Sequence, residues 1–489
     1  MAAPGSDAPP RDVLTGGDVG FRVLRGGVQR TAGFVAVNII GAAAAVLLLR
    51  YLGVEDFGRY GTVMALLAVV QGISDAGLSL TGSRELSVRD SEAERRDLLA
   101  HLLGLRIVLT AAGVLVAVGF AWVAGYGREL VEGTAIAGAG IFLVSVQGAM
   151  LLPLMVELLN GRLTINEVLR PLALMICFVV LVVTGADLLA FFAAQLVAAA
   201  IVLAATPALL QRHRIVAPRW TRARLRALAL TALPLALASV LGVLYFRILV
   251  ILMSVLEDSP HEIGLFVTSS RITEIFIALP AILVGIVLPV LSVAAQDNEV
   301  RLNFVTQRTT QVLGLLGVLF ALVLCIGAEP IITILGGEQY AGAAPVLQIQ
   351  CIALVTIFIT GAWTTTLVSM EHTRPLAWAT AVGVVAVTVL GALLIPPHGA
   401  IGGAIAAVAG DVIFCSYVFV TLWRAGPGRA LAAAPFLRAA AAAAPIVVFA
   451  LLSPLPELVE ALVAAVAFPL LAFVTGAVPV EIRDRVLRR

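Results

Sequence analysis

The sequence predicts an all-α polytopic membrane protein with about 14 transmembrane helices, and three observations support this fold class. Mean hydropathy is +1.05, and only 13% of residues are charged, about half the quarter expected of a soluble domain. Apolar stretches of about 20 residues, the length that crosses roughly 30 Å of hydrocarbon, recur along the whole chain. Arginines gather in alternate gaps between these stretches.

The hydropathy pattern divides the chain into spans joined by short polar gaps. The predicted spans are residues 31–49, 60–80, 98–124, 132–156, 168–184, 187–210, 228–256, 263–291, 310–327, 344–369, 375–395, 400–423, 432–452 and 457–476.

The distribution of arginine predicts the topology. All 32 basic residues are arginine; most of them lie in or next to both terminal tails and the even-numbered gaps, while the opposite gaps carry only Arg50, Arg59 and Arg128. Because basic loops stay in the cytoplasm, both termini are expected there, which requires an even number of spans. We expect a multi-pass protein of a prokaryotic plasma (inner) membrane, since the exclusive use of arginine suggests a GC-rich genome.

The net charge of +2 predicts no nucleic-acid partner. The basic run 212–226 is a loop between spans, and its arginines fit a topology signal and contact with anionic lipid headgroups.

Two similar turns predict an internal repeat. Residues 52–60 follow the first span and residues 256–266 follow the seventh; each is an acidic, outward-facing turn ending in apolar–Gly–x–aromatic. A parallel repeat of six spans indicates two six-helix lobes in a pseudo-two-fold arrangement, with a cavity between them. The predicted parts are a cytoplasmic tail (1–30), an N-lobe with a basic linker (31–227), a C-lobe (228–424), and two extra helices with a basic cytoplasmic tail (425–489).

Charged residues within the C-lobe spans are the first candidate binding residues, because charge at membrane depth is costly and usually faces a polar cavity or a partner. Arg247 lies about 14 Å inside the seventh span at 1.5 Å per residue. Arg271 and Glu274 lie about 12 and 17 Å into the eighth span on the same reckoning. These two are three residues apart and therefore neighbours on one helix face.

The N-lobe carries a matching set. Asp75 in the second span and Arg106 in the third lie at similar depth, and Gln71 is one turn before Asp75. With the C-lobe residues they would line a cationic cavity suited to phosphate or pyrophosphate, since guanidinium donates two hydrogen bonds at once. The alternative left open is that these charges form salt bridges that only hold helices together.

No pattern in the chain predicts catalysis, a metal or a cofactor. The five histidines have no metal-binding spacing, the four cysteines lie in separate spans, and neither a P-loop nor a Gly-x-Ser-x-Gly turn occurs. We therefore expect a protein that is not an enzyme.

Several loose motifs in a fixed order resemble the polysaccharide-transporter branch of the multidrug/oligosaccharidyl-lipid/polysaccharide flippase superfamily. The matching runs are 49–60, 74–78, 84–86, 233–234, 245–247, 263–266, 271–274, 288–289, 337–340, 344–347 and 399–406.

This resemblance implies a flippase that carries an undecaprenyl-pyrophosphate-linked oligosaccharide to the outer leaflet by alternating access, for cell-surface polysaccharide synthesis. Arg247 and Arg271 would contact the pyrophosphate or the sugar, and a polymerase or export protein could be a partner. Many relatives have an acidic residue where this chain has Leu249, which argues against ion coupling at that position.

Two alternatives remain open. A cation-coupled multidrug exporter of the same superfamily would favour an acidic central cavity. A membrane-embedded polysaccharide polymerase or glycosyltransferase would need catalytic residues on a substantial external loop, and this sequence has no such loop.

Overall fold

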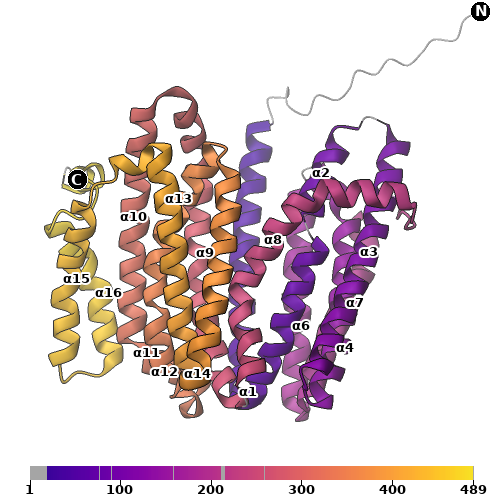
Figure 1. Ribbon diagram of the computed structural model, residues 1–489, viewed down its shortest axis with the longest axis horizontal. Helices are drawn as coiled ribbons and strands as arrows, with labels where there is room; N and C mark the ends of the chain where they lie inside the picture. The colour runs from indigo at the N-terminus through magenta and orange to yellow at the C-terminus, as the bar shows by residue number, and fades with distance from the viewer. Residues whose placement is uncertain are drawn as a thin grey trace, which may run out of the picture.

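The computed structural model describes residues 19–487 except residues 76, 90, 158, 211–214 and 258, and this part of the chain folds into helices without any strand (Figure 1). The helices are α1 (Val19–Asp75), α2 (Leu78–Ser87), α3 (Glu92–Val123), α4 (Arg128–Met150), α5 (Leu152–Val156), α6 (Asn160–Thr184), α7 (Leu188–Leu210), α8 (Arg222–Leu256), α9 (Pro260–Asp297), α10 (Glu299–Ile326), α11 (Ala328–Gly336), η1 (Glu338–Tyr340), α12 (Ala343–Gln350), α13 (Ile352–Ser369), α14 (Thr373–Ala425), η2 (Pro427–Ala430), α15 (Ala434–Leu452), α16 (Glu457–Val474) and α17 (Val480–Leu487).

Two of these helices are long enough to cross a membrane twice. Among the described residues, 12 helical segments are long and apolar enough to span a bilayer. The helices α1 and α14 each include a single glycine with positive φ, Gly53 at 74° and Gly399 at 53°, a conformation that glycine adopts without steric cost. Counting each of these two segments as two spans gives the 14 predicted, and the all-α polytopic fold class is confirmed.

Two predicted breaks are wrong in detail, and part of the predicted tail is helical. The turn expected at 52–60 is helical except at Gly53, and the loop expected at 396–399 is helical up to Gly399. The tail expected at 1–30 becomes helical at Val19; residues 1–18 of that tail lie outside the described part. In each case the helix continues from its neighbour because propagation adds one hydrogen bond per residue and avoids a new nucleation step.

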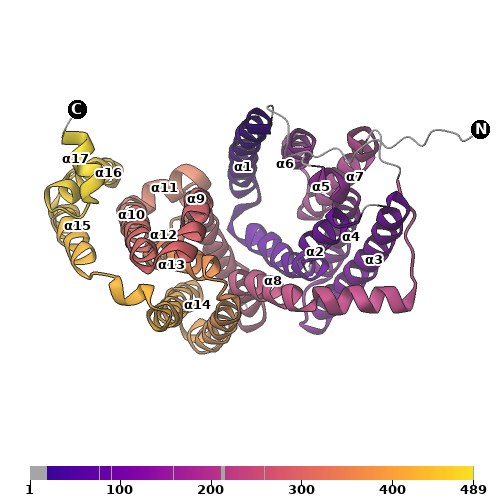
Figure 2. The same ribbon diagram turned by 90° about the horizontal axis from the view of Figure 1, so that it is seen from above.

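The helices form two bundles. Helices α1–α7, which we call the N-bundle, pack mainly through α4 with α7, α3 with α4, and α1 with α6. Helices α9–α14, the C-bundle, pack through α10 with α13 and α13 with α14. Figures 1 and 2 show the bundles side by side with α8 passing between them, and α15 and α16 beyond α10.

Helix α8 belongs to both bundles. Near its start, Ala232 joins an apolar cluster with Leu78 of α2 and Leu102 of α3, and farther along α8 packs against α14. The linker before α8 is held on α3: Arg219 donates to the Asp97 carboxylate at 2.6 Å. Gly104 permits this contact, because an added Cβ would lie 2.2 Å from the Arg219 carbonyl oxygen.

The two bundles meet closely at one face. We call the face at which α1 begins and α16 ends the termini face (upper side of Figure 1), and the opposite one the far face. At the far face α1 crosses α9 at Gly58 and Gly264, the glycines of the two similar turns. An added Cβ on Gly264 would lie 2.0 Å from the Val54 carbonyl oxygen, and one on Gly58 would lie 2.4 Å from that of Pro260. Only glycine permits these backbones to touch.

Polar contacts join the bundles at the same face. Tyr340 of η1 donates its hydroxyl to the Leu49 carbonyl at 3.0 Å, and Arg50 donates to the Ile334 carbonyl at 2.6 Å. In each bond the donor and the acceptor belong to different bundles. The far face is therefore closed by both packing and hydrogen bonding.

We predict that Gly264→Val destabilises this closed far face. Valine would push its own Cβ into the Val54 carbonyl, and overpacking of this kind costs about 1–3 kcal/mol. Gly285→Val on the same helix is the matched control, because the space around Gly285 is open. The apparent thermal midpoint of the purified protein should fall for Gly264→Val and stay unchanged or rise for the control; equal losses would contradict the prediction.

Candidate functional site

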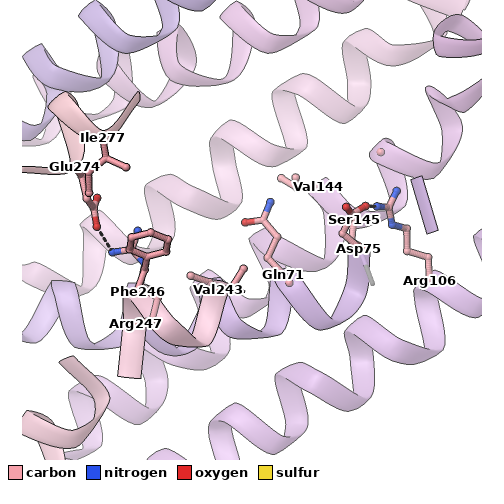
Figure 3. A pocket seen from close by; sticks show the side chains of 13 residues that line it. Gln71, Asp75, Arg106, Val144, Ser145, Val243, Phe246, Arg247, Glu274 and Ile277 are labelled. Carbon is pink, nitrogen blue, oxygen red and sulfur yellow. Dashed lines mark hydrogen bonds and ion pairs between the residues drawn. The ribbon is translucent and has the colours of Figure 1, made fainter. Parts of the chain in front are cut away.

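A cavity of about 590 Å³ lies between the two bundles, and both contribute to its walls. Helices α1, α3 and α4 form one wall, and α8 and α9 form the other. The lining includes five of the six residues singled out from the sequence: Gln71, Asp75, Arg106, Arg247 and Glu274. Figure 3 shows Gln71 between an ion pair on each wall. We call this space the central cavity.

Glu274 organises the charges on the C-bundle wall. Its carboxylate accepts a hydrogen bond from Arg247 at 2.7 Å and another from Arg271 at 3.2 Å. Arg271 does not line the central cavity itself but joins the cluster through this bond. Helical spacing in the sequence predicted a pair between Glu274 and Arg271, three residues away. It could not predict that Glu274 also pairs with Arg247, because Arg247 lies on a different helix. Arg247 and Glu274 keep 25% and 26% of their side-chain surface exposed, so both can meet a ligand.

Asp75 plays the corresponding part on the N-bundle wall. Its carboxylate accepts hydrogen bonds from Arg106 and from Ser79, the latter at 2.6 Å. Arg106 is only 7% exposed, whereas Asp75 is 50% exposed. Burying a guanidinium is costly without a paired carboxylate, so Asp75 stabilises the position of Arg106.

A glycine makes room for the Arg106 guanidinium. An added Cβ on Gly148 of α4 would lie 2.9 Å from Arg106 Nη1. Nothing in the sequence distinguishes this glycine from others in apolar spans, because its role depends on a side chain from another helix.

The charges around the cavity do not cancel. Two guanidiniums (Arg106, Arg247) and two carboxylates (Asp75, Glu274) line the cavity itself, and Arg271, bonded to Glu274 outside the lining, brings the net charge of the cluster to +1. Apolar side chains such as Phe246 and Ile277 complete the walls, so these charges act in a weakly polarisable setting where electrostatic attraction is strong. The cavity therefore favours a ligand with an anionic group and apolar parts.

A second cavity, of about 1010 Å³, lies nearer the termini face (Figure 1). It lies between α2 and the start of α8, and Arg84, Arg89 and Leu235 are among its lining residues. Leu235 precedes Val243 of the central cavity by about 12 Å along the helix at 1.5 Å per residue. Open space therefore also lies on the termini side of the central cavity, whereas the glycine crossing closes the far face.

A partly buried carboxylate in the C-bundle escaped the sequence analysis. Asp411 of α14 accepts a hydrogen bond from the hydroxyl of Tyr245 on α8, and both line a further cavity of about 270 Å³. The signal was available, because Asp411 lies inside the predicted span 400–423 and meets the criterion that selected Glu274. The described residues contain no group of three or more His, Cys, Asp or Glu side chains that could hold a metal ion.

Comparisons with known proteins agree with this architecture. A family profile described as "Polysaccharide biosynthesis protein" matches residues 47–345, more than half of the chain. No curated protein sequence matches.

Solved structures share the fold at low identity. The structure of "Lipid II flippase MurJ, inward closed conformation" is 14% identical, with a TM-score of 0.78 over 94% of this chain and 100% of that one. An inward-facing multidrug resistance MATE family transporter of the MOP superfamily is 14% identical, with a TM-score of 0.66 over 80% and 95%. A mutant of the Vibrio cholerae MATE transporter VcmN is also 14% identical, with a TM-score of 0.52 over 83% and 96%.

The family profile and the shared fold lead to one assignment, in agreement with the resemblance seen in the sequence motifs. The chain belongs to the polysaccharide biosynthesis protein family and is a multi-pass integral membrane protein with the transporter fold of the MOP flippase superfamily.

Proposed function

We propose that this protein flips an undecaprenyl-pyrophosphate-linked oligosaccharide from the inner to the outer leaflet of a prokaryotic plasma membrane by alternating access. Its product would feed a polysaccharide polymerase or export protein outside the cytoplasm, and the protein itself would act without catalysis. The observation that carries this proposal is the charged cluster at the central cavity between two bundles of a polysaccharide biosynthesis protein: Arg106 and Arg247 line the cavity with two carboxylates, and Arg271 adds a third guanidinium through Glu274.

The chemistry of the cavity supports a pyrophosphate ligand. Arginine stays charged and its planar fork matches phosphate oxygens. Arg247 and Arg271 already share one carboxylate, Glu274, so an incoming pyrophosphate can compete for their donors without leaving a bare charge in the membrane. Gln71, which is exposed between the two walls, adds a neutral donor and acceptor for the ligand.

The direction of opening supports uptake from the cytoplasm. The arginine-rich gaps predict that the termini face is cytoplasmic, and the second cavity, beside the start of α8, lies between the central cavity and that face. Reorientation would require the glycine crossing at the far face to separate while the termini face closes.

The primary test is the lipid-linked saccharide pool of cells depleted of this protein, sorted by membrane leaflet. We expect an undecaprenyl-linked oligosaccharide to accumulate on the cytoplasmic face. An unchanged pool combined with increased sensitivity to cationic drugs would instead support the multidrug exporter.

We predict that Arg247→Gln lowers transport about tenfold or more, the loss expected when a charge-assisted hydrogen bond is removed. The double variant Arg247→Gln/Glu274→Gln tests scaffolding by this ion pair, because it replaces the pair with two amides that can hydrogen-bond, while the amide oxygen at position 274 can still accept from Arg271. A binding role predicts that the double variant stays defective; recovery of transport would show that the ion pair is only structural. Arg374→Gln, at an exposed position at the start of α14, is the matched control and should transport normally at equal membrane abundance.

We predict that Gly148→Val impairs transport several-fold with little loss of stability. The three atoms nearest an added Cβ all belong to the Arg106 guanidinium, so valine displaces this group within the cavity, where the half-exposed Asp75 can stay paired with it, and leaves the backbone packing in place. Gly119→Val, placed in open space on α3, is the control. Transport per molecule and the apparent thermal midpoint check this prediction, and a large fall in the midpoint for Gly148→Val would contradict it.

A further inference from the structure

A hydroxyl-lined chamber lies inside the C-bundle next to the central cavity. Its wide part is the cavity of about 270 Å³ between α8, α13 and α14, and its narrow part is a cavity of about 80 Å³ that reaches α9. Tyr245, Phe246 and Asp411 line both parts. We call the two parts together the C-bundle chamber.

The chamber adjoins the proposed pyrophosphate site. Phe246, Glu274 and Ile277 line both the narrow part and the central cavity. Glu274 is the carboxylate that holds Arg247 and Arg271. A group bonded directly to a phosphate at these arginines would therefore lie at the entrance of the chamber.

The wide part offers hydrogen-bond acceptors and no free donors among the side-chain hydroxyls that line it, since each already donates within the protein. Tyr245 donates to Asp411, and four threonines donate to carbonyls of their own helices at 2.6–3.2 Å: Thr356, Thr360, Thr364 and Thr380. Their lone pairs and the Asp411 carboxylate remain available, so a ligand here must bring donors.

A buried amide oxygen in the narrow part also requires a hydrogen-bond donor from the ligand. Gln350 is 6% exposed, and its Nε2 donates to Ser270 Oγ at 3.1 Å. Its Oε1 is buried without a hydrogen-bond partner in the described structure. Leaving such an acceptor unpaired costs free energy, which a donor on a ligand would recover.

The aromatic lining and the volume indicate a ring in place of a bare ion. Tyr245 packs against Phe246 and Phe414, with ring centroids 5.5 and 5.6 Å apart, so the chamber has broad apolar walls around a few polar groups, as small-molecule sites do. At about 30 Å³ per water molecule, the wide part corresponds to roughly nine waters. One carboxylate in so large a space cannot replace the hydration shell of a cation.

We propose that the C-bundle chamber is the subsite for the uncharged sugar ring nearest the pyrophosphate of the transported lipid. Sugar hydroxyls would donate to Asp411, to the threonine oxygens and to Gln350, while the ring faces pack on the aromatic side chains. This inference rests on the proposed flippase function and assigns sugar recognition to residues apart from the arginines.

Binding of defined lipids to the purified full-length protein tests the assignment. The probes are radiolabelled undecaprenyl pyrophosphate, bare or carrying one hexose, N-acetylhexosamine or 6-deoxyhexose. We expect the wild-type protein to bind at least one glycosylated probe more tightly than the bare lipid. Asp411→Asn should weaken binding of that probe roughly tenfold to hundredfold, as for a hydrogen bond to a charged group, and leave binding of the bare lipid unchanged.

Substitutions of one threonine supply a second measure that does not depend on the folding of Asp411→Asn. Thr364→Val should weaken binding of the glycosylated probe about two- to tenfold, and Thr364→Ser should restore it. Thr388→Val is the matched control: this hydroxyl also donates to its own helix, at 2.6 Å, but Thr388 is not among the residues lining the chamber.

Each other outcome rejects the subsite or the function. Equal affinity of the wild-type protein for bare and glycosylated lipid, or equal weakening of both by Asp411→Asn, would overturn the sugar subsite alone. So would loss of a sodium or proton dependence with unchanged sugar affinity, which would identify a cation site. Failure of the wild-type protein to bind any of the lipids would overturn the flippase function itself.

Discussion

The backbone contact between Gly58 and Gly264 is the constraint on which the arrangement of the two bundles depends. Because an added Cβ at either glycine would collide with a carbonyl oxygen of the other helix, α1 and α9 can approach this closely at the far face only with glycine at both positions. Tyr340 and Arg50 add hydrogen bonds between the bundles on the same side. With the bundles held at the far face, the space between them lies toward the termini face, and that space contains the charged cavity.

Charge placement in this cavity follows from the cost of ionised groups in a membrane. Every guanidinium of the cluster is paired with a carboxylate. Glu274 forms ion pairs with Arg247 and Arg271, and Asp75 forms one with Arg106. Sharing one carboxylate between two arginines produces the net positive charge without a bare ion. The same requirement explains Gly148, because a guanidinium that must stay beside Asp75 needs space on the facing helix.

The two walls of the C-bundle differ in chemistry. The wall toward the central cavity carries arginines, whereas the interior chamber presents acceptors from Asp411, Gln350 and the threonines of α13. An anionic group and a donor-rich neutral group would therefore be drawn to adjacent but separate places. Helix α8 connects these places, since Arg247 and Tyr245 lie two residues apart on it, and its start is anchored in the N-bundle through Ala232.

Hydropathy and arginine placement by themselves determined the fold class, the number of spans and the expected topology, because desolvation of the backbone and of charge acts on each segment separately. The same reasoning selected Asp75, Arg106, Arg247, Arg271 and Glu274, since a charge inside an apolar span is visible without coordinates. It overlooked Asp411 and could not find the Arg247–Glu274 pair, because helical spacing relates residues of one helix only. Which side chains face each other across helices, where Gly53 and Gly399 bend, and which glycines permit contact were decided by the tertiary structure, since close packing depends on the surfaces of two helices at once.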